Sequence, residues 1–309
     1  MILCCGEALI DMLPRRLSDG GRAFLPAAGG AVFNTAIAIG RLGAPVGFFS
    51  GLSTDFFGDL LRETLEASQV DTGIAVSLER PTTLAFVTLV EGQARYDFYD
   101  ENTAGRMLSA ADLPALGDRV EALFFGGISL IAEPCGATFE TLATRESSKR
   151  VIMLDPNVRP GFVSDETAYR ARLERLIALA DIVKLSDEDL LWLRGEGEID
   201  RRAEAILAQG PALVIVTRGA DAATGYSRHH RVAVRSHSVA VVDTIGAGDT
   251  FNAGVLTVLH ERRLLSKPAV AALGEDDLRA ALALGSAAAA VTVSRAGADT
   301  PWRSEIAGP

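Results

Sequence analysis

The sequence predicts an α/β fold in which a mostly parallel central sheet carries helices on both faces, with a small β-sheet lid at one edge. Nearly continuous apolar runs alternate with amphipathic helical patterns along most of the chain. Strands placed between helices in this way are typical of parallel sheets that are buried on both faces. Two segments, at about residues 12–28 and 82–100, break the alternation and favour antiparallel strands. We expect them to form a lid that excludes water from a site below it; the alternative is an ordinary edge hairpin.

The predicted strands and helices follow one another in regular order. Strands are expected at Ile2–Cys5, Val46–Ser50, Leu123–Gly126, Val151–Leu154, Ile182–Leu185, Leu213–Thr217 and Val232–Ala240. Helices are expected at Val32–Leu42, Phe56–Ser68, Ala168–Leu179, Glu188–Leu193, Arg201–Ala208, Thr250–His260 and Leu278–Thr292. Glu91-Gly92 is the expected hairpin turn of the second lid segment. Because no long linker or internal repeat interrupts this order, we expect residues 1–309 to form a single domain.

The composition narrows the classes of function. The chain has 309 residues, of which 48% are hydrophobic and 23% charged, so it can bury a large core. Its net charge of -10 argues against nucleic acid or an anionic membrane as the main partner. Cys4, Cys5 and Cys135 show no zinc-binding spacing, and their odd number indicates reduced thiols. Since the chain shows no signal peptide and no apolar run long enough to span a membrane, we expect a cytoplasmic protein.

One glycine-rich stretch carries most of the functional information. Residues 242–254 read V-D-T-I-G-A-G-D-T-F-N-A-G, so Gly246, Ala247 and Gly248 precede the carboxylate of Asp249 and open an apolar helix. Small residues let backbone N–H groups converge on an anion, and a helix N-terminus adds unpaired amides. A carboxylate at such a place can take a proton from an attacking hydroxyl while the amides hold the transferred group. The stretch therefore points to phosphoryl transfer, although a glycine turn with a capping Asp would look the same.

Further polar residues follow other predicted elements and would meet at the carboxyl edge of the sheet. Asp11 comes after the first strand and can accept hydrogen bonds from substrate hydroxyls. Gly29 and Gly30 let the backbone approach a ligand closely, and Asn34 in the following helix can both donate to and accept from a hydroxyl. Arg159, in the sequence D-P-N-V-R, can offset the charge of a phosphoryl group. Each of these residues could instead serve only a cap or a turn.

Two later strand ends suggest contacts for a nucleotide and a metal ion. The segment K-L-S-D-E-D begins at Lys184, and its Ser186 and Asp189 could hold hydrated Mg²⁺, which keeps several waters and needs few protein ligands. A capped helix explains the same residues. Thr217 and Gly219 form a turn after the next strand, which could contact distal phosphates or only reverse the chain.

In this order and spacing the segments resemble the ribokinase family of carbohydrate kinases, also called the PfkB type, from Gly6 to Gly297. The stretch from Asp243 to Gly254 matches the second signature of that family, whereas Val32 stands where the first signature usually has Pro, Gly or Ala. The resemblance implies a ribokinase-like three-layer fold with a β lid. It also implies transfer of the γ-phosphate of ATP to a sugar hydroxyl, with Mg²⁺.

The resemblance assigns roles to individual residues. It implies that Asp249 is the catalytic base and that the amides of Gly246, Ala247 and Gly248 form the anion hole. The residues expected to bind the sugar are Asp11, Gly29, Gly30, Asn34, Arg95, Phe98, Asn102 and Arg159. The residues expected to contact the nucleotide are Lys184, Ser186, Thr217, Gly219, Asp243, Ala288 and Gly297, with Asp189 beside Mg²⁺. Ser186 and Asp189 replace the Asn and Glu of the family's N-x-x-E element, and the Ala-rich helix around Ala288 could equally serve core packing.

Three short motifs favour a particular sugar. The opening G-E-A-L-I-D, the loop G-G-A-x-x-N-x-A and D-P-N-x-R look most like fructokinases and 2-keto-3-deoxygluconate kinases. Asp100 stands where those relatives often carry an Arg, which favours a neutral sugar over a sugar acid, so fructose is the expected substrate. The alternatives are a 2-keto-3-deoxygluconate kinase, a ribokinase, a nucleoside kinase, or a regulator that only binds sugar or nucleotide.

The resemblance also bears on assembly and on a second cation. Lid strands in this family often pair between subunits, so a homodimer is expected. K⁺, if a monovalent cation is required, is expected near Val239–Asp243 and Arg295–Gly297.

Overall fold

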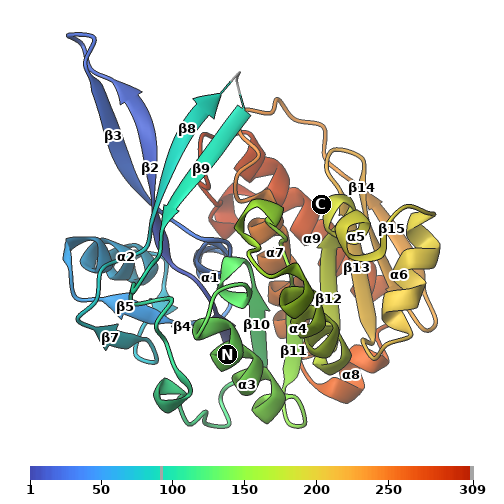
Figure 1. Cartoon of the computed structure of the whole chain (residues 1–309). Coiled ribbons are helices and arrows are strands. Elements are labelled where there is room, and N and C mark those ends of the chain that lie inside the picture. The colour runs from blue at the N-terminus through green and yellow to red at the C-terminus, as the bar shows by residue number, and fades with distance from the viewer. Residues whose placement is uncertain (91–92, 307–309) are drawn as a thin grey trace.

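Figure 1 shows the computed structural model of the chain, which describes residues 1–90 and 93–306. Within these residues, nine strands form one sheet in the order β15-β14-β13-β12-β11-β10-β1-β4-β6. The strands are β1 (Ile2–Cys5), β4 (Val46–Phe49), β6 (Val70–Asp71), β10 (Ala122–Gly126), β11 (Val151–Asp155), β12 (Ile182–Ser186), β13 (Leu213–Arg218), β14 (Ala222–Ser227) and β15 (Arg231–Arg235). All neighbours from β13 to β6 pair in parallel, and only the β13–β14 and β14–β15 pairs are antiparallel. The mostly parallel sheet is confirmed.

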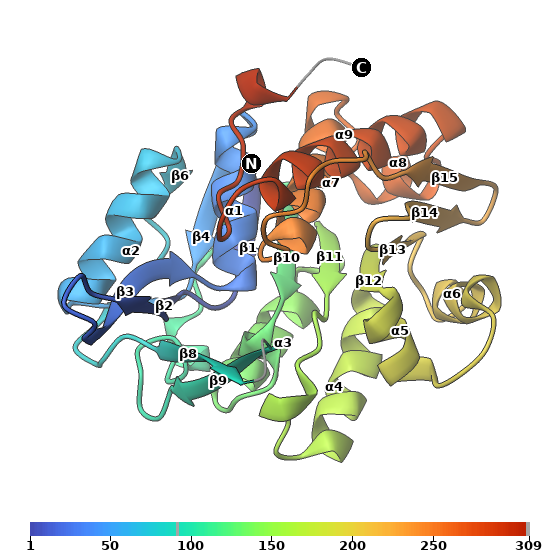
Figure 2. The same ribbon diagram turned by 90° about the horizontal axis from the view of Figure 1, so that it is seen from above.

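Helices cover both faces of this sheet, and each face has its own apolar core. The first core lies under α1 (Ala31–Arg41), α2 (Phe56–Ala67), α7 (Ala247–Glu261), α8 (Lys267–Ala271) and α9 (Glu275–Val293). The second core lies under α3 (Cys135–Glu146), α4 (Glu166–Leu179), α5 (Asp187–Arg194) and α6 (Ile199–Leu207). Figure 2 shows α1, α7 and α9 on one side of the strands and α3 to α6 on the other. The three layers are those expected for strands that are apolar on both faces.

The two segments that break the α/β alternation form a separate small sheet, which projects from the carboxyl edge of the large one in Figure 1. Its strands are β2 (Leu9–Arg16), β3 (Arg22–Gly29), β8 (Leu84–Val90) and β9 (Gln93–Tyr99), in the order β3-β2-β8-β9. Each segment is an antiparallel pair, as predicted, but β2 and β8 join the two pairs in parallel. The turn expected at Glu91-Gly92 lies outside the described residues. We call this sheet the lid.

Several parts of the sequence prediction differ from the structure. The strand expected at Val232–Ala240 ends at Arg235. The elements that were not predicted are α3, α8, β5 (Gly51–Ser53), β6, β7 (Val76–Leu78) and β14, of which β14 and α3 are the longest strand and helix. The β14 sequence A-A-T-G-Y-S contains a glycine and two alanines, which have low strand propensity. The α3 sequence contains a glycine and three threonines, which are poor helix formers. Packing against the sheet decides both elements, because their local propensities do not.

Candidate active site

The glycine-rich turn opens α7 as predicted. Gly246 is the N-cap of α7 and has φ 78°, a left-handed conformation that glycine adopts without strain. A Cβ atom there would also stand 2.8 Å from the Cβ of Ala298, so no larger residue fits without a shift. The amides of Ala247, Gly248 and Asp249 lie in the first helical turn, where no preceding helical carbonyl can take them up. The amide of Ala247 donates to the backbone oxygen of Thr244 over 3.4 Å, whereas those of Gly248 and Asp249 have no backbone acceptor among the described residues. These two amides are therefore available as hydrogen-bond donors for an anion.

Asp249 lies at the same point and is only 6% exposed. Its Oδ2 accepts a hydrogen bond of 2.9 Å from Nδ2 of Asn34, and its backbone oxygen accepts one of 3.3 Å from the hydroxyl of Thr35. Burial raises the pKa of Asp249 to about 7, and the charge of Asp155 adds to the rise. The bond from Asn34 and the charges of Lys184 and Arg159 oppose it. A carboxyl with a pKa near neutrality is suited to accept a proton from a hydroxyl.

A buried ion pair lies beside the glycine turn. Nζ of Lys184 donates to Oδ2 of Asp155 over 3.0 Å, and Nδ2 of Asn252 donates to the same oxygen over 2.6 Å. Burial alone would lower the pKa of Lys184, but the charges of Asp155 and Asp189 raise it above its usual range. A Cβ at Gly248 would stand 3.1 Å from Nζ of Lys184, so this ammonium group lies directly beside the anion-binding turn.

Sequence reasoning missed Asn252. It lies one helical turn after Asp249, a spacing that places both side chains on the same face of α7. Its Oδ1 is buried and finds no partner among the described residues. Asp155, the first residue of the D-P-N-V-R motif, is the acceptor that ties Asn252 to Lys184.

Asp11 lies in β2 on the lid and offers an acceptor that the protein leaves open. Within the described part of the chain, no hydrogen bond or ion pair reaches its carboxylate, and burial raises its pKa to about 6. Gly29 makes room for it, since a Cβ there would stand 2.4 Å from Oδ2 of Asp11. Gly30 has φ 113°, and its missing side chain keeps the loop close to the backbone of Glu7. The arrangement suits a substrate hydroxyl at Asp11.

The lid residues expected near the sugar are only partly brought to one place. Asp11 pairs with Ala85 and Ala85 pairs with Phe98, so Asp11 and Phe98 share one face of the lid. The ring of Phe98 packs edge-on against Phe162, with the ring centroids 4.1 Å apart, in the short helix that follows Arg159. This contact places the Asp11 face of the lid toward the carboxyl edge of the large sheet.

The remaining predicted sugar contacts are less closely placed. The side chain of Arg95 lies outside the described part of the chain. The Oδ1 of Asn102 already accepts a hydrogen bond from Arg80. Arg159 is exposed at the rim. Asp100 pairs over 2.9 Å with Arg106, which lines a small cavity at the base of the lid, so the structure supplies an arginine near this point from another position.

Asp189 is held tightly by the protein. Its Oδ1 accepts the amide of Val158 over 2.8 Å, and its Oδ2 accepts the hydroxyl and amide of Ser186 over 2.7 Å and 3.0 Å. The capping box that Ser186 and Asp189 form starts α5, as one interpretation of the sequence expected. Direct metal coordination by Asp189 would have to compete with these bonds. Within the described residues, no group of three or more His, Cys, Asp or Glu side chains could hold a metal ion by itself.

The residues predicted to contact the nucleotide line one end of the same edge, with one exception. Thr217 is the next-to-last residue of β13, and Gly219 directly follows that strand with φ 46°. The two loops named as a cation region meet, because the amide of Gly297 donates to Oδ2 of Asp243 over 2.9 Å. Ala288, however, is 0% exposed within α9, so a direct contact with adenine is not supported. Core packing accounts for this alanine.

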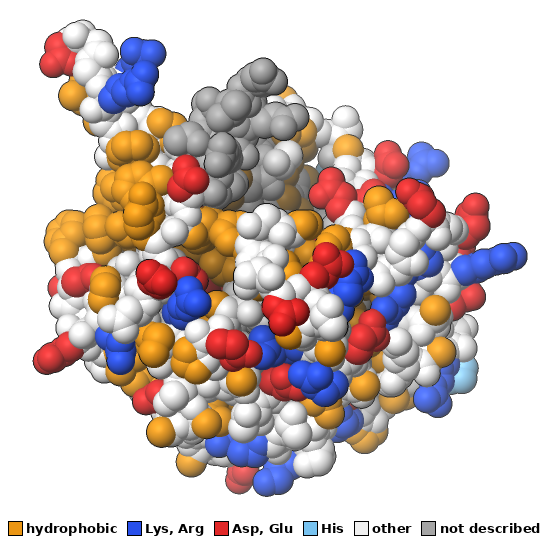
Figure 3. Space-filling view, viewed as in Figure 1, with side chains coloured by type: hydrophobic (Ala, Val, Ile, Leu, Met, Phe, Trp, Pro, Cys, Tyr) orange, Lys and Arg blue, Asp and Glu red, His pale blue; other side chains and the backbone are white. Residues whose placement is uncertain are grey.

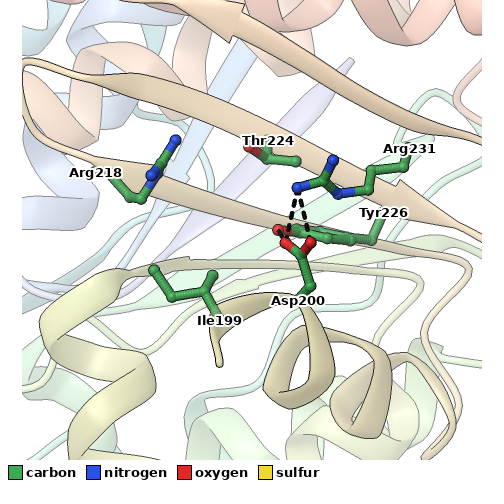
Figure 4. Close-up of a pocket in the computed structure, with 6 residues that line it drawn as sticks. All are labelled: Ile199, Asp200, Arg218, Thr224, Tyr226 and Arg231. Atoms are coloured by element: carbon green, nitrogen blue, oxygen red, sulfur yellow. Dashed lines mark hydrogen bonds and ion pairs between the residues drawn. The ribbon is translucent and has the colours of Figure 1, made fainter. Parts of the chain in front are cut away.

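A second hollow lies away from this site, on the α6 side of the sheet (Figure 4). There Asp200 forms an ion pair of 2.8 Å with Arg231 and accepts the Tyr226 hydroxyl over 2.6 Å. These contacts tie α6 to β14 and β15, and the acid is already matched by a base. We therefore assign this hollow a structural role.

No helix in the described residues is long and apolar enough to cross a membrane.

The comparisons with known proteins agree with this geometry. A model of the pfkB family carbohydrate kinases matches residues 1–305. A fructokinase from Rhizobium leguminosarum bv. trifolii is 56% identical over 279 residues, which are 90% of this chain and 86% of that protein. The structure of a fructokinase with bound ATP from Xylella fastidiosa gives a TM-score of 0.89 at 29% identity, covering 99% of this chain and 96% of that one. A fructokinase from Vibrio cholerae O395 in its fructose, ADP and calcium-bound form gives 0.82 at 27% identity, covering 96% and 94%. With its family model, its fold and its glycine turn in agreement, the chain belongs to the pfkB family of carbohydrate kinases.

Proposed function

We propose that this protein is an ATP-dependent fructokinase. The observation that carries the proposal is the buried carboxylate of Asp249, whose pKa is raised to about 7, directly after the glycine turn of residues 246–248 at the N-terminus of α7. A proton acceptor and an anion site at one point are what the transfer of a phosphoryl group to a hydroxyl requires. The 56% identity to a fructokinase supports fructose as the acceptor.

In the proposed reaction a sugar hydroxyl attacks the γ-phosphorus of ATP in line with the bond to the leaving ADP. Asp249 takes the hydroxyl proton as the new O–P bond forms and the bond to ADP breaks. Asn34 orients Asp249, and Asp11 accepts a second sugar hydroxyl. The amides of the glycine turn and the ammonium of Lys184 offset the negative charge on the transferred group. Positioning and electrostatics supply most of the rate.

Mg²⁺ fits this site as an ion carried by the nucleotide rather than by a protein cage. Mg²⁺ usually keeps several waters and binds substrate phosphates with one or two carboxylates. Asp189 and Asp155 are buried acids at this edge, and both already accept protein hydrogen bonds, so we propose that they act on a metal through water. When bound, the metal would neutralise charge on the phosphates. The junction of Asp243 with Gly297 is the proposed place for K⁺.

An ADP-release assay with ATP and Mg²⁺ tests the proposal. The panel contains fructose, ribose, 2-keto-3-deoxygluconate, glucose and adenosine. We expect strong turnover on fructose, because Asp11 and Asn34 are neutral-sugar contacts. Preference for another acceptor would keep the mechanism and overturn the choice of sugar. No turnover on any acceptor by folded protein that still binds ATP would favour a non-catalytic regulator.

The pH dependence of kcat/KM follows from the two raised pKa values. Asp249 must be ionised to accept a proton, so activity is present above its pKa and is lost as the pH falls. We expect the acid limb to have its midpoint near pH 7 and to steepen below about pH 6, where Asp11 also protonates. A profile measured with fructose across this range, with rates corrected for inactivation, checks this. Full activity at pH 5 would contradict the role of Asp249 as base.

The outer face of the lid supports a proposed homodimer. On the face opposite Asp11, the rings of Phe24, Phe86 and Tyr99 form a row with centroids 5.0 Å and 5.4 Å apart. Phe24 is 44% exposed and Tyr99 62% exposed, and Figure 3 shows hydrophobic side chains gathered over this region. Such a patch on a surface is typical of an interface.

We expect light scattering to report a dimer for the unmodified protein and a monomer for Phe24→Glu, because a charge would be buried in the interface. Leu191→Glu is the matched control, since Leu191 is equally exposed (43%) but lies on α5. A monomeric unmodified protein at micromolar concentration would remove this proposal.

The three cysteines are all buried and form no disulfide, which is consistent with the cytoplasmic location that we also propose.

A further inference from the structure

Glu7 is a buried acid that neither the sequence motifs nor the proposed reaction uses. It lies two residues after the end of β1, at the carboxyl edge of the sheet, and is 8% exposed. Its Oε1 accepts the amides of Ala31 and Val32 over 2.9 Å and 3.4 Å, and its Oε2 accepts the amide of Ser129 over 3.2 Å. No ion pair to Glu7 is present among the described residues, so hydrogen bonds from backbone amides and from the side chain of Ser129 compensate its burial.

The surrounding backbone is shaped to this carboxylate. Gly127 has φ 68°, and a Cβ there would stand 2.1 Å from Oε1 of Glu7. Gly30 has φ 113°, and a Cβ there would stand 3.2 Å from Cγ of Glu7. Two glycines in conformations that other residues rarely adopt therefore close around one side chain.

The contact replaces the usual cap of α1. Gly30 is the N-cap residue of α1 and has no side chain to accept the first amides of the helix. Glu7, from the end of β1, accepts two of them instead, and its negative charge faces the positive end of the helix. The same end of α1 carries Asn34, in its first turn, and Thr35, the next residue, which both bond to Asp249.

We propose that Glu7 is a positioning residue, which fixes the first turn of α1 to the ends of β1 and β10 and so holds Asn34 against Asp249. The inference rests on the proposed function, because it takes Asp249 as the base. It assigns to Glu7 no contact with sugar, nucleotide or the transferred group. Its effect on turnover passes through Asn34 alone.

The test compares Glu7→Ala and Glu7→Gln with the unmodified protein. Alanine removes the cap, whereas glutamine keeps one acceptor but turns a donor toward the amide of Ser129. We expect kcat to fall about 10²-fold in Glu7→Ala, the loss typical of a reacting group displaced by about 1 Å, and less in Glu7→Gln. Glutamine also keeps the proposal testable if the alanine variant does not fold. Glu146→Gln is the matched control, because Glu146, the last residue of α3, is as deeply buried as Glu7 but forms an ion pair with Arg150.

Two readouts separate positioning from a general loss of structure. Burial and the charge of Asp155 raise the pKa of Asp249, and the hydrogen bond from Asn34 lowers it. The charges of Lys184 and Arg159 also lower this pKa, and they are present in every variant. Loss of that bond should move the acid limb of kcat/KM to higher pH in Glu7→Ala and Asn34→Ala alike, but not in Glu146→Gln. In a double-mutant cycle, adding Glu7→Ala to Asn34→Ala should change kcat little further.

Hydrogen exchange gives a readout that does not depend on activity. We expect faster exchange at residues 31–35 in both Glu7 variants and unchanged exchange there in Glu146→Gln. An unmoved acid limb together with additive losses in the cycle would overturn the positioning role. Asp249→Asn is measured in parallel. If this variant stays active, Asp249 is not the base and the proposed function fails. If it is inactive and the Glu7 variants behave like Glu146→Gln, only the positioning role of Glu7 fails.

Discussion

Replacing Asp249 by asparagine is expected to lower kcat with fructose by about 10²–10⁴-fold, the usual contribution of a positioned general base. The amide has nearly the shape of the carboxylate and can still accept the hydrogen bond from Asn34, but it cannot take up the hydroxyl proton. Fructose affinity should change little, because Asp11 and the glycine loop remain. Single-turnover kinetics and calorimetric sugar binding measure the two effects separately.

The same substitution should make the protein more stable. The pKa of Asp249 is about 7 in the folded protein against an ordinary value of 3.8, so the folded state holds this proton more tightly than the unfolded state. Stability from this group is therefore full below about pH 4 and is lost as the pH rises through 7. Asparagine does not ionise, so this loss in the free energy of unfolding, on the order of a few kcal/mol at pH 8, is absent from the variant.

Thermal unfolding at pH 5 and pH 8 checks the sign: the gain of Asp249→Asn should be larger at pH 8. Asp276→Asn is the matched control, because Asp276 also lies in the first turn of a helix but is exposed. Its kcat and its melting temperature should stay within error of the unmodified protein. Near-normal turnover by Asp249→Asn would remove the base assignment.

Gly246→Ala is expected to lower kcat by about 10²–10³-fold, the cost of losing one donor of an anion hole. The φ of 78° disfavours alanine, and its Cβ would meet Ala298 at 2.8 Å. The turn must therefore shift and carry the amides of the first helical turn away from the phosphoryl group. KM for fructose should change much less than kcat.

Gly274→Ala provides the control for this second prediction. Gly274 is the N-cap of α9, as Gly246 is of α7, but it has φ -77° and meets no atom closer than 4.0 Å from an added Cβ. Its turnover should be unchanged. Equal losses in the two variants would mean that glycine at a helix start matters only for folding, and the anion-hole assignment would fall.

Local sequence patterns were enough to predict the layers, the lid and the glycine turn that opens α7. These features are local: a strand or helix is recorded in the period of its apolar residues, and the glycine turn stands within four residues of its carboxylate. The sequence also placed Asp11 and Asp249 at one edge of the sheet, because parallel strands bring their carboxyl ends together.

Which side chains meet at that edge depends on long-range packing. Asn34 bonds to Asp249 across 215 positions of the chain, Asn252 to Asp155 across 97, and Glu7 to Ser129 across 122. Such contacts depend on how whole elements pack, and no local pattern encodes them. Packing likewise buried Ala288, since an Ala-rich helix carries too weak an apolar pattern to show which face meets the core.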